Sequence, residues 1–319
     1  SKNHNKRVQG IVRRLHQNGL LWHYHLALQT LTPLALELSH RTNMRANDYE
    51  PVVKALAAEG VPVAAELIWG LPGDTLAEFG QNLDHLFSIF PNVNIFAYTL
   101  LPGTEFYDKR DEYQLVTLPV SGYGKAKGEY VVGCHTFPRE EGEEGYVLVA
   151  SHVMLSRGHV IPYTIRLLAL DGRASVSTLL RDAVRALIAA FGPTVPADTR
   201  TSRMAIYEER AALYLAFLSD RDRLYDILDA CIATHLAERG ADDLLPRVRQ
   251  VLSVDRALCP RTGPEVTIAP EFDFAADTVL EALGQMEHPD ADAFLTGDPV
   301  TLDIRHVGGV GEVLKDPDG

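Results

Sequence analysis

The stretch Glu66-Leu-Ile-Trp-Gly-Leu-Pro-Gly-Asp-Thr75 decides how the first part of the chain is interpreted. Its apolar residues predict a strand, and Gly70-Leu-Pro-Gly73 predicts a tight turn. Thr75 and Glu78 have the spacing of a capping box, in which the hydroxyl accepts a helix amide and the carboxylate bonds back to the cap amide. Apolar residues then repeat with a helical period. Strand, turn and helix together predict one βα unit of an α/β protein.

The same alternation continues on both sides of this unit. Strands are predicted over Leu21–Gln29, Val61–Trp69 and Val93–Leu101, with helices over Pro33–His40 and Asp48–Glu59 between them. Each crossover helix returns the chain to begin a parallel strand, so a parallel sheet or barrel is expected. Three strands do not close a barrel, since an eight-stranded barrel takes about 250 residues. We therefore expect the chain, which has no initiating Met, to be the later part of a longer polypeptide.

The pattern changes near residue 122, which predicts two domains, 1–122 and 123–319. The second is expected to be mostly helical α+β, with a strand over Gly128–Thr136 and helices over Arg139–Arg157, from Ser175 to Gly192, and through 202–254. Short strands are expected at Val266–Ala269 and Val300–Ile304.

Composition excludes several classes of function. The 319 residues carry 43 acidic and 30 basic side chains, a net charge of −13, whereas a nucleic-acid surface needs a basic footprint. No apolar run approaches the ~20 residues of a membrane span. The 3 cysteines are too few and too scattered for a disulfide framework. We expect a cytoplasmic protein with neither nucleic acid nor membrane as a partner.

Five segments occur in an order that resembles a known family: Lys2-Asn3, Leu28-Gln29-Thr30, Arg41-Thr42-Asn43, Glu66–Gly73 and Tyr98–Thr104. Together they resemble the radical S-adenosylmethionine (SAM) proteins, and more narrowly the subgroup with an N-terminal cobalamin-binding domain. The resemblance implies that residues 1–122 are the C-terminal half of a radical SAM (β/α) barrel of the TIM-barrel type. The remainder would be a capping and substrate domain.

The resemblance also implies which residues bind SAM. Glu66-x-Ile68-x-Gly70 is similar to the family's adenine-contacting pattern, and Gln29 with Thr30 would contact the ribose or the amino-acid end of SAM. The residues expected to flank the adenine are Tyr98, Leu100, Leu101 and Pro102. Each has an ordinary structural alternative: a tight turn at Gly70, helix capping near Gln29 and Thr30, and barrel core for the last four.

Glu66, His25 and Tyr24 are the candidate catalytic residues. Strand alternation places Glu66 on the face of Ile68, and a carboxylate in a buried strand needs a partner. His23 and His25 share one face, but no third ligand is apparent, so they are predicted to line the substrate cavity and no metal site is predicted. Tyr24 points to the opposite face unless a bulge intervenes, and would then meet an aromatic substrate or cobalamin.

The chain departs from the family at the iron–sulfur site. The family holds a [4Fe-4S] cluster with three cysteines spaced C-x-x-x-C-x-x-C, and Cys134, Cys231 and Cys259 lack this spacing. The cluster ligands and the cobalamin domain are therefore expected in a region N-terminal to Ser1, which would be this chain's partner.

The resemblance implies an enzyme, a cobalamin-dependent radical-SAM-type methyltransferase. Its substrate would be a small molecule or natural-product precursor, and an aromatic amino acid is expected because histidines and aromatic residues lie near the cavity. Tryptophan, as in antibiotic biosynthesis, is one candidate, and a carbapenem- or peptide-type substrate stays open. Two alternatives stay open: a radical SAM enzyme that forms rings or rearranges its substrate, and a module that holds SAM or cobalamin without turnover.

Overall fold

The computed structural model describes residues 6–21, 23–42, 46–120, 128–295 and 299–307. Lys2, Asn3 and Asn43 of the family-like segments lie outside these ranges. The chain forms two compact units, Ser1–Val149 and Ala150–Gly319. The two domains divided at residue 122 stay a prediction.

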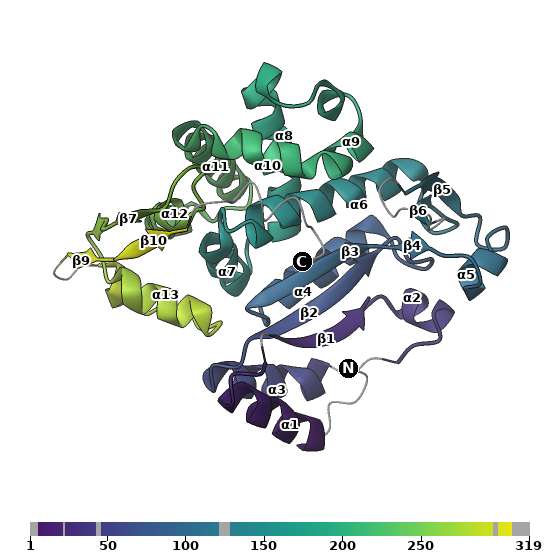
Figure 1. Ribbon diagram of the computed structural model, residues 1–319, viewed down its shortest axis with the longest axis horizontal. Helices are drawn as coiled ribbons and strands as arrows, with labels where there is room; N and C mark the ends of the chain where they lie inside the picture. Colours follow the sequence, from purple (N-terminus) through teal and green to yellow (C-terminus); the bar gives the residue numbers. More distant parts are fainter. Residues whose placement is uncertain (1–5, 22, 43–45, 121–127, 296–298, 308–319) are drawn as a thin grey trace. The chain divides into compact units, whose positions relative to one another are not determined.

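The first unit is built on a parallel sheet in the order β1 (Tyr24–Gln29), β2 (Val63–Trp69) and β3 (Asn92–Ala97), as Figure 1 shows. The helices α3 (Ala46–Ala58) and α4 (Leu76–Phe87) connect these strands and contact the sheet. The predicted α/β class with a parallel sheet is thereby confirmed. Membership of a barrel stays a prediction.

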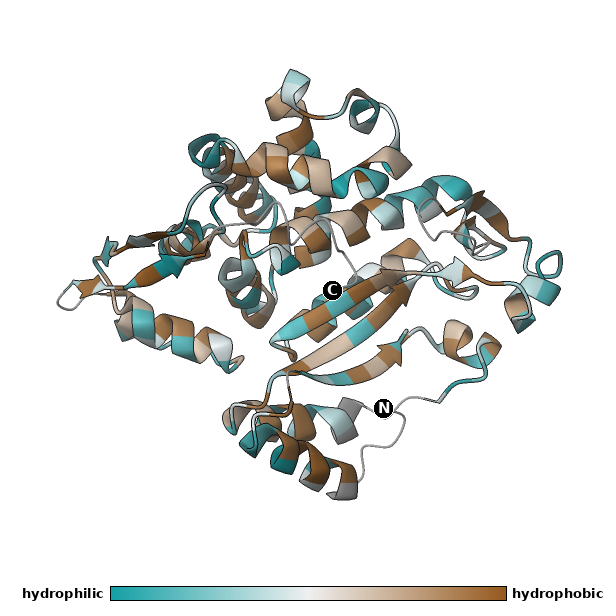
Figure 2. Cartoon of the chain, viewed as in Figure 1, coloured by the Kyte–Doolittle hydropathy of each residue, from teal (hydrophilic) through white to brown (hydrophobic). Residues whose placement is uncertain are grey.

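The two faces of this sheet differ in chemistry. Leu26, Leu67 and Trp69 lie on the face toward the helices and are fully buried. On the other face Glu66 is partly exposed and Phe96 is 50% exposed. Polar and apolar residues alternate over the first four residues of β3, Asn-Val-Asn-Ile, and the strand then ends in apolar residues (Figure 2). One face holds the core, and the other, here called the open face, keeps side chains such as Glu66 and Phe96 accessible to solvent.

The remaining elements of the first unit are α1 (Lys6–Gln17), α2 (Pro33–Leu38), β4 (Thr99–Leu100), α5 (Glu105–Asp108), β5 (Val116–Pro119), β6 (Glu129–Gly133) and α6 (Arg139–His152). A second, antiparallel sheet has the order β4-β6-β5. The single strand predicted over Val93–Leu101 is wrong. The Tyr98 amide still donates to the Trp69 carbonyl at 2.7 Å, and after it the chain leaves β3 to pair with β6.

Trp69 is the centre of the first core. Its ring packs against Phe79 and Phe137, with centroids 5.0 and 5.1 Å away. Its indole Nε1–H donates to the carbonyl of Gly142 in α6 at 3.0 Å, so the buried ring leaves no polar atom unsatisfied. Gly145, one turn further on, lies so close that a Cβ there would overlap the indole ring. Glycine is therefore required at this helix–sheet contact.

The predicted helix starts are confirmed in part. The Thr75 side chain caps α4 by accepting from the Glu78 amide at 3.2 Å. The second half of the capping box is wrong, because the Glu78 carboxylate accepts from the Thr75 hydroxyl at 2.8 Å and not from the backbone. Pro33 is in the first turn of α2, but Thr32 makes no side-chain cap bond there.

The second unit is mostly helical. Its helices are η1 (a π-helix, Val153–Arg157), α7 (Pro162–Asp171), α8 (Val176–Phe191), η2 (Gly192–Thr194), η3 (Ala197–Arg200), α9 (Arg203–Glu208), α10 (Arg210–Leu218), α11 (Arg221–Ala237), η4 (Asp242–Leu244), α12 (Leu245–Leu258), α13 (Ala276–Gly284) and η5 (Ala291–Phe294). Helix α8 packs on α11, and α7 packs on α12. The uniform helix predicted over Arg139–Arg157 is wrong in its last turn, where it widens into η1.

The short tail strands pair as two antiparallel ribbons, β7 (Val266–Ile268) with β10 (Ile304–His306) and β8 (Glu271–Phe272) with β9 (Val300–Thr301). Throughout the described ranges, no helix combines the length and the apolar character that crossing a bilayer requires.

Gly145→Ala should destabilise the chain severely, by about 3 kcal/mol or more, since the added methyl group has to displace the Trp69 ring in a close-packed core. Gly10→Ala is the matched control, because nothing lies within 4 Å of a Cβ at this exposed helix position. It should leave stability equal or raise it by up to about 1 kcal/mol. Urea unfolding of the three proteins measures both effects, and equal stabilities would contradict the packing described.

Candidate functional site

Polar side chains from all strands of the parallel sheet meet on the open face. His25 Nδ1 lies 2.9 Å from Glu66 Oε1. Asn94 Nδ2 lies 3.4 Å from the same His25 nitrogen. The register explains the meeting, since Glu66 is paired with Ala27 on one side and with Asn94 on the other. The structure thus brings together Glu66 and His25, which were predicted, and Asn94, which was not.

The Glu66 contact defines the tautomer of His25. An ionised carboxylate only accepts hydrogen bonds, so His25 Nδ1 carries the proton and donates it to Glu66. Asn94 Nδ2 is also a donor, so its approach to this nitrogen is a contact and not a hydrogen bond. In the neutral ring, Nε2 is then the nitrogen with the lone pair. The two side chains remain 41% and 26% exposed, so the pair is within reach of a ligand. Such a pair can accept or hold a proton at Nε2 while Glu66 orients the ring.

Asn94 is a further polar residue of this face. It is only 7% exposed, and within the described part of the chain its Oδ1 has no hydrogen-bond partner. A buried polar atom without a partner is costly and calls for an explanation. The sequence carries a signal for it, because Asn92 and Asn94 alternate in a strand, where asparagine is uncommon.

His23 and Ile68 lie near Glu66 and His25 on the open face, whereas Tyr24 does not. The His23 ring lies 5.8 Å from the His25 ring, between centroids. Ile68 is paired with Phe96 further along the open face, toward the carboxyl ends of the strands. Tyr24 is buried on the opposite face, where burial raises its pKa. The structure therefore does not bring Tyr24 to the Glu66–His25 pair, and its catalytic role has no support in this placement.

Thr30, at the end of β1, belongs to a buried network of hydrogen bonds. Its hydroxyl donates to Asp74 Oδ1 at 2.8 Å and accepts from the Thr32 amide at 3.1 Å. Burial raises the pKa of Asp74 to about 6, although hydrogen bonds from Thr32 and Thr30 act in the opposite direction. The network joins the end of β1 to the turn after β2. Thr30 is fully buried, so contact with SAM stays a prediction that its present contacts do not favour.

Gln29 adopts a left-handed backbone conformation, with φ of 63°. The pairing of β1 with β2 shifts at this point, so Gln29 forms an irregularity that ends the strand. Its side-chain oxygen accepts a hydrogen bond from Arg41, the residue that begins the family-like Arg41-Thr42-Asn43 segment. This contact joins two predicted motifs, and Gln29 remains partly exposed at the strand end.

Gly70 and Gly73 both have positive φ, 102° and 101°. A Cβ at Gly70 would lie 3.2 Å from the Val131 carbonyl oxygen and 3.5 Å from Tyr98 Cβ. One at Gly73 would lie 2.6 Å from the Ala35 nitrogen. Both glycines therefore serve the turn and its packing against the chain itself. Contact between Gly70 and SAM stays a prediction.

The predicted adenine-flanking residues do not form one surface. Leu100 is fully buried, whereas Leu101 is 46% exposed and Pro102 is exposed. Tyr98 stacks edge-on against Phe106, and burial raises its pKa to about 12. Tyr98, Leu101 and Pro102 remain accessible to a ligand, and Leu100 belongs to the core.

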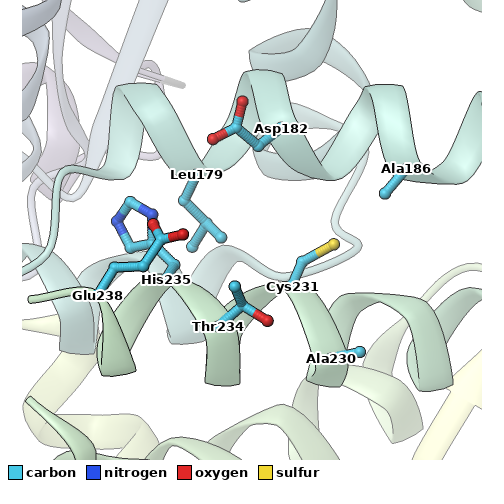
Figure 3. A pocket seen from close by; sticks show the side chains of 8 residues that line it. All are labelled: Leu179, Asp182, Ala186, Ala230, Cys231, Thr234, His235 and Glu238. Carbon is cyan, nitrogen blue, oxygen red and sulfur yellow. The ribbon is translucent and has the colours of Figure 1, made fainter.

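A hollow of about 330 Å³ lies between α8 and α11 in the second unit, lined in part by Asp182, Cys231, Thr234, His235 and Glu238 (Figure 3). The Arg239 guanidinium can only donate, so it bonds the unprotonated Nδ1 of His235 at 3.1 Å. Burial and this charge lower the His235 pKa to about 4. The hollow contains none of the predicted site residues.

Within the part of the chain that the structure describes, the cysteines and acids do not form a metal centre. Cys134, Cys231 and Cys259 are all free thiols on separate elements. Across the ranges that the structure describes, no three His, Cys, Asp or Glu side chains are placed to share a metal ion, and this includes the hollow at His235.

Asp74→Asn tests the charge of the strand-end network. The pKa of Asp74 rises on folding from 3.8 to about 6, so its stabilising contribution is complete below about pH 4 and is lost as the pH rises through 6. Asparagine keeps an acceptor for Thr30 and cannot ionise. The stability of the variant relative to the parent should therefore rise by about 1–3 kcal/mol between pH 4 and 7. Urea unfolding across this range measures the difference. Asp111→Asn, at an exposed position, is the control and should show no such trend.

Comparison with known proteins gives one distant similarity. No family model matches the chain. Over 171 residues, which are 50% of this chain and 25% of the relative, it is 27% identical to the cobalamin-dependent radical SAM methyltransferase TokK of Streptomyces tokunonensis. The chain thus spans about a quarter of the length of that relative. The similarity is to the same family that the sequence motifs resemble, and it suggests that family at a distance.

Proposed function

We propose that this chain is the C-terminal half of a radical SAM (β/α) barrel with its capping domain, part of a cobalamin-dependent radical-SAM-type methyltransferase. Two observations support the proposal independently. The 27% identity to TokK covers half of the chain. The parallel strands β1–β2–β3 carry helices on one face and a cluster of polar side chains on the other.

The open face carries the argument. In a (β/α) barrel the helices cover the outside of the strands, and the inner side chains and strand ends surround the active site. The covered face of this sheet holds Leu26, Leu67 and Trp69 and would be the outside. The face of His25 and Glu66 would then line the barrel interior.

The chemistry of this face favours a small substrate with both apolar and hydrogen-bonding parts. Glu66 and Asn94 Oδ1 are acceptors, while Ile68 and the half-exposed ring of Phe96 are apolar. An aromatic amino acid such as tryptophan combines an apolar ring with N–H donors and fits these groups. His25 would hold or move a proton at Nε2, and Glu66 would keep its ring oriented.

The cofactors fit this chain to different extents. Gln29, Ile68 and Tyr98 are accessible and would hold SAM, which supplies the methyl group when bound. Gly70 offers no cradle for a ligand, because Val131 and Tyr98 already fill the space beside it. Three cysteines on separate elements do not fit a [4Fe-4S] cluster. In this proposal both are held outside this chain.

The test is product analysis with the full-length protein, purified without oxygen and supplied with methyl-labelled SAM. A labelled methyl group in the product is the expected result. A product without the label would favour ring formation or rearrangement, and SAM binding without turnover would favour a binding module. Either of these results would overturn the methyltransferase proposal.

Glu66→Gln should lower turnover by about 100-fold or more, because the amide no longer fixes the His25 proton on Nδ1. Its stability should change by less than about 1 kcal/mol, since the pair is partly exposed. The exposed Glu37→Gln is the matched control and should leave both quantities unchanged. Lost stability with normal turnover per folded molecule would instead make Glu66 a structural residue.

A further inference from the structure

The hollow between α8 and α11 in the second unit is a cavity that the proposed function does not use. One face of α8 lines it with Leu179, Asp182 and Ala186, and α11 lines it with residues between 230 and 238 (Figure 3). The two helices pack against each other, and the short side chains of Ala186 and Ala230 leave space between them. A volume of about 330 Å³ is enough for a small organic molecule.

Two carboxylates from opposite walls of the hollow lack a close partner. Asp182 lies 3.9 Å from an Arg185 nitrogen, and Glu238 lies 3.7 Å from an Arg239 nitrogen. Both distances are longer than a hydrogen bond, and neither carboxylate makes a side-chain hydrogen bond within the described ranges. The Asp182 and Glu238 side chains are 59% and 67% exposed, so a ligand can reach both.

Another acid of α11 shows what close pairing looks like in this unit. Both oxygens of Asp229 accept hydrogen bonds from the Arg249 guanidinium, each at 2.8 Å. That carboxylate is already bound by an arginine of the chain itself. Asp182 and Glu238 instead keep their oxygens available at the hollow.

His235 adds no positive charge to the wall of the hollow. The Arg239 guanidinium donates to its Nδ1 at 3.1 Å and to its backbone carbonyl at 3.2 Å. Since Nδ1 accepts this bond, the proton of the neutral ring is on Nε2. His235 is only 4% exposed, and its Nε2 makes no hydrogen bond within the described part of the chain. A buried donor without an acceptor is costly and points to a ligand that supplies one.

The rest of the hollow is mainly apolar. Leu179 is buried and lies between the carboxyl groups of Asp182 and Glu238 in the view of Figure 3. Farther along, the Cys231 thiol points from α11 toward α8, where Ala186 lies on the opposite wall (Figure 3). The hollow therefore joins an acidic end to an apolar end.

We propose that this hollow binds a small organic amine that carries an oxygen acceptor beside its ammonium group, as an amino alcohol does. The ammonium would donate to Asp182 and Glu238, the oxygen would accept from His235 Nε2, and an apolar body would lie against Leu179. No three metal ligands meet here among the described residues, which favours an ammonium over a metal ion. The site belongs to the second unit alone, so it stands whether or not the proposed methyltransferase function is correct.

The first experiment measures binding of leucinol to the full chain at pH 7 by calorimetry and thermal unfolding, with sodium chloride at equal ionic strength as the reference. Leucinol should bind and raise the melting temperature above that in sodium chloride. Two relatives of the probe separate its groups. 4-Methylpentan-1-ol lacks the ammonium and should bind about tenfold or more weakly, and 4-methylpentan-1-amine lacks the hydroxyl and should bind about threefold or more weakly. Absence of leucinol binding, or equal binding of either relative, would overturn the proposal.

Cys231 reports whether the probe occupies the hollow. Leucinol should slow the reaction of its thiol with methyl methanethiosulfonate, measured by mass spectrometry of the Cys231 peptide. Cys134 is the control, a partly buried free thiol in the first unit, and its reaction rate should not change. Binding heat without protection of Cys231 would place the amine elsewhere and contradict the proposal.

Asp182→Asn should weaken leucinol binding by about tenfold or more, since one charge-assisted interaction with the ammonium is lost. Without the probe, its melting temperature should match that of the parent, because the side chain is exposed and not closely paired. Asp198→Asn is the matched control, an exposed position of the same unit with the same change of net charge, and it should bind like the parent. Equal binding in the two variants would show that Asp182 does not contact the ammonium.

Ala186→Leu tests the hollow itself without changing its charge. The larger side chain fills space that the ligand would take, so leucinol binding should fall by about tenfold or more while the melting temperature stays at least that of the parent. Ala189→Leu, at an exposed position of the same helix outside the hollow, is the control and should leave binding unchanged. A folded Ala186→Leu variant that binds leucinol like the parent would exclude the hollow as the site.

Discussion

The contact between Trp69 and the glycines of α6 is the constraint on which the first unit depends. The indole fills the space that Gly145 leaves open, and its N–H is satisfied by the Gly142 carbonyl. Trp69 ends β2, so this contact decides which face of the sheet turns to the helices. Strand alternation then places Glu66 and Ile68 on the opposite face. The location of the candidate site is thus a consequence of how the core is packed.

The Glu66–His25 pair is a candidate site because it lies on that face. The residue types alone would not indicate a site, since an ionisable side chain in a strand often forms a salt bridge. Here the partner lies on the adjacent strand, is oriented at 2.9 Å and stays accessible. Asn94 adds a buried acceptor with no partner in the described residues. These features are the basis of the proposed ligand site on this face.

Several residues of the family-like motifs serve the fold itself. Thr30 and Asp74 hold the ends of β1 and β2 together, and Gly73 lets the turn pack against α2. These uses explain why such residues occur in this order without requiring each of them to touch a ligand. In the second unit, the hydroxyls of Tyr214 and Tyr225 likewise serve the fold, because they donate to the carbonyls of Gly158 and Val160 on either side of His159, whose φ is 54°.

The sequence alone determined the local elements and their order. Hydrophobic period, turn glycines and the Thr75 cap predict β2, its turn and α4, because these signals act over a few residues. The same local patterns placed Glu66 on the face of Ile68 and His25 on the face of His23, and both pairs were predicted to line the cavity. They could not predict that the chain leaves the parallel sheet after Tyr98 and pairs with β6, or that the Thr30 hydroxyl donates to Asp74. Nor could they predict that Asn94 lies beside His25. Those outcomes depend on partners up to about 70 residues away in the chain, and only the tertiary structure decides which distant side chains compete for one hydrogen bond or one cavity.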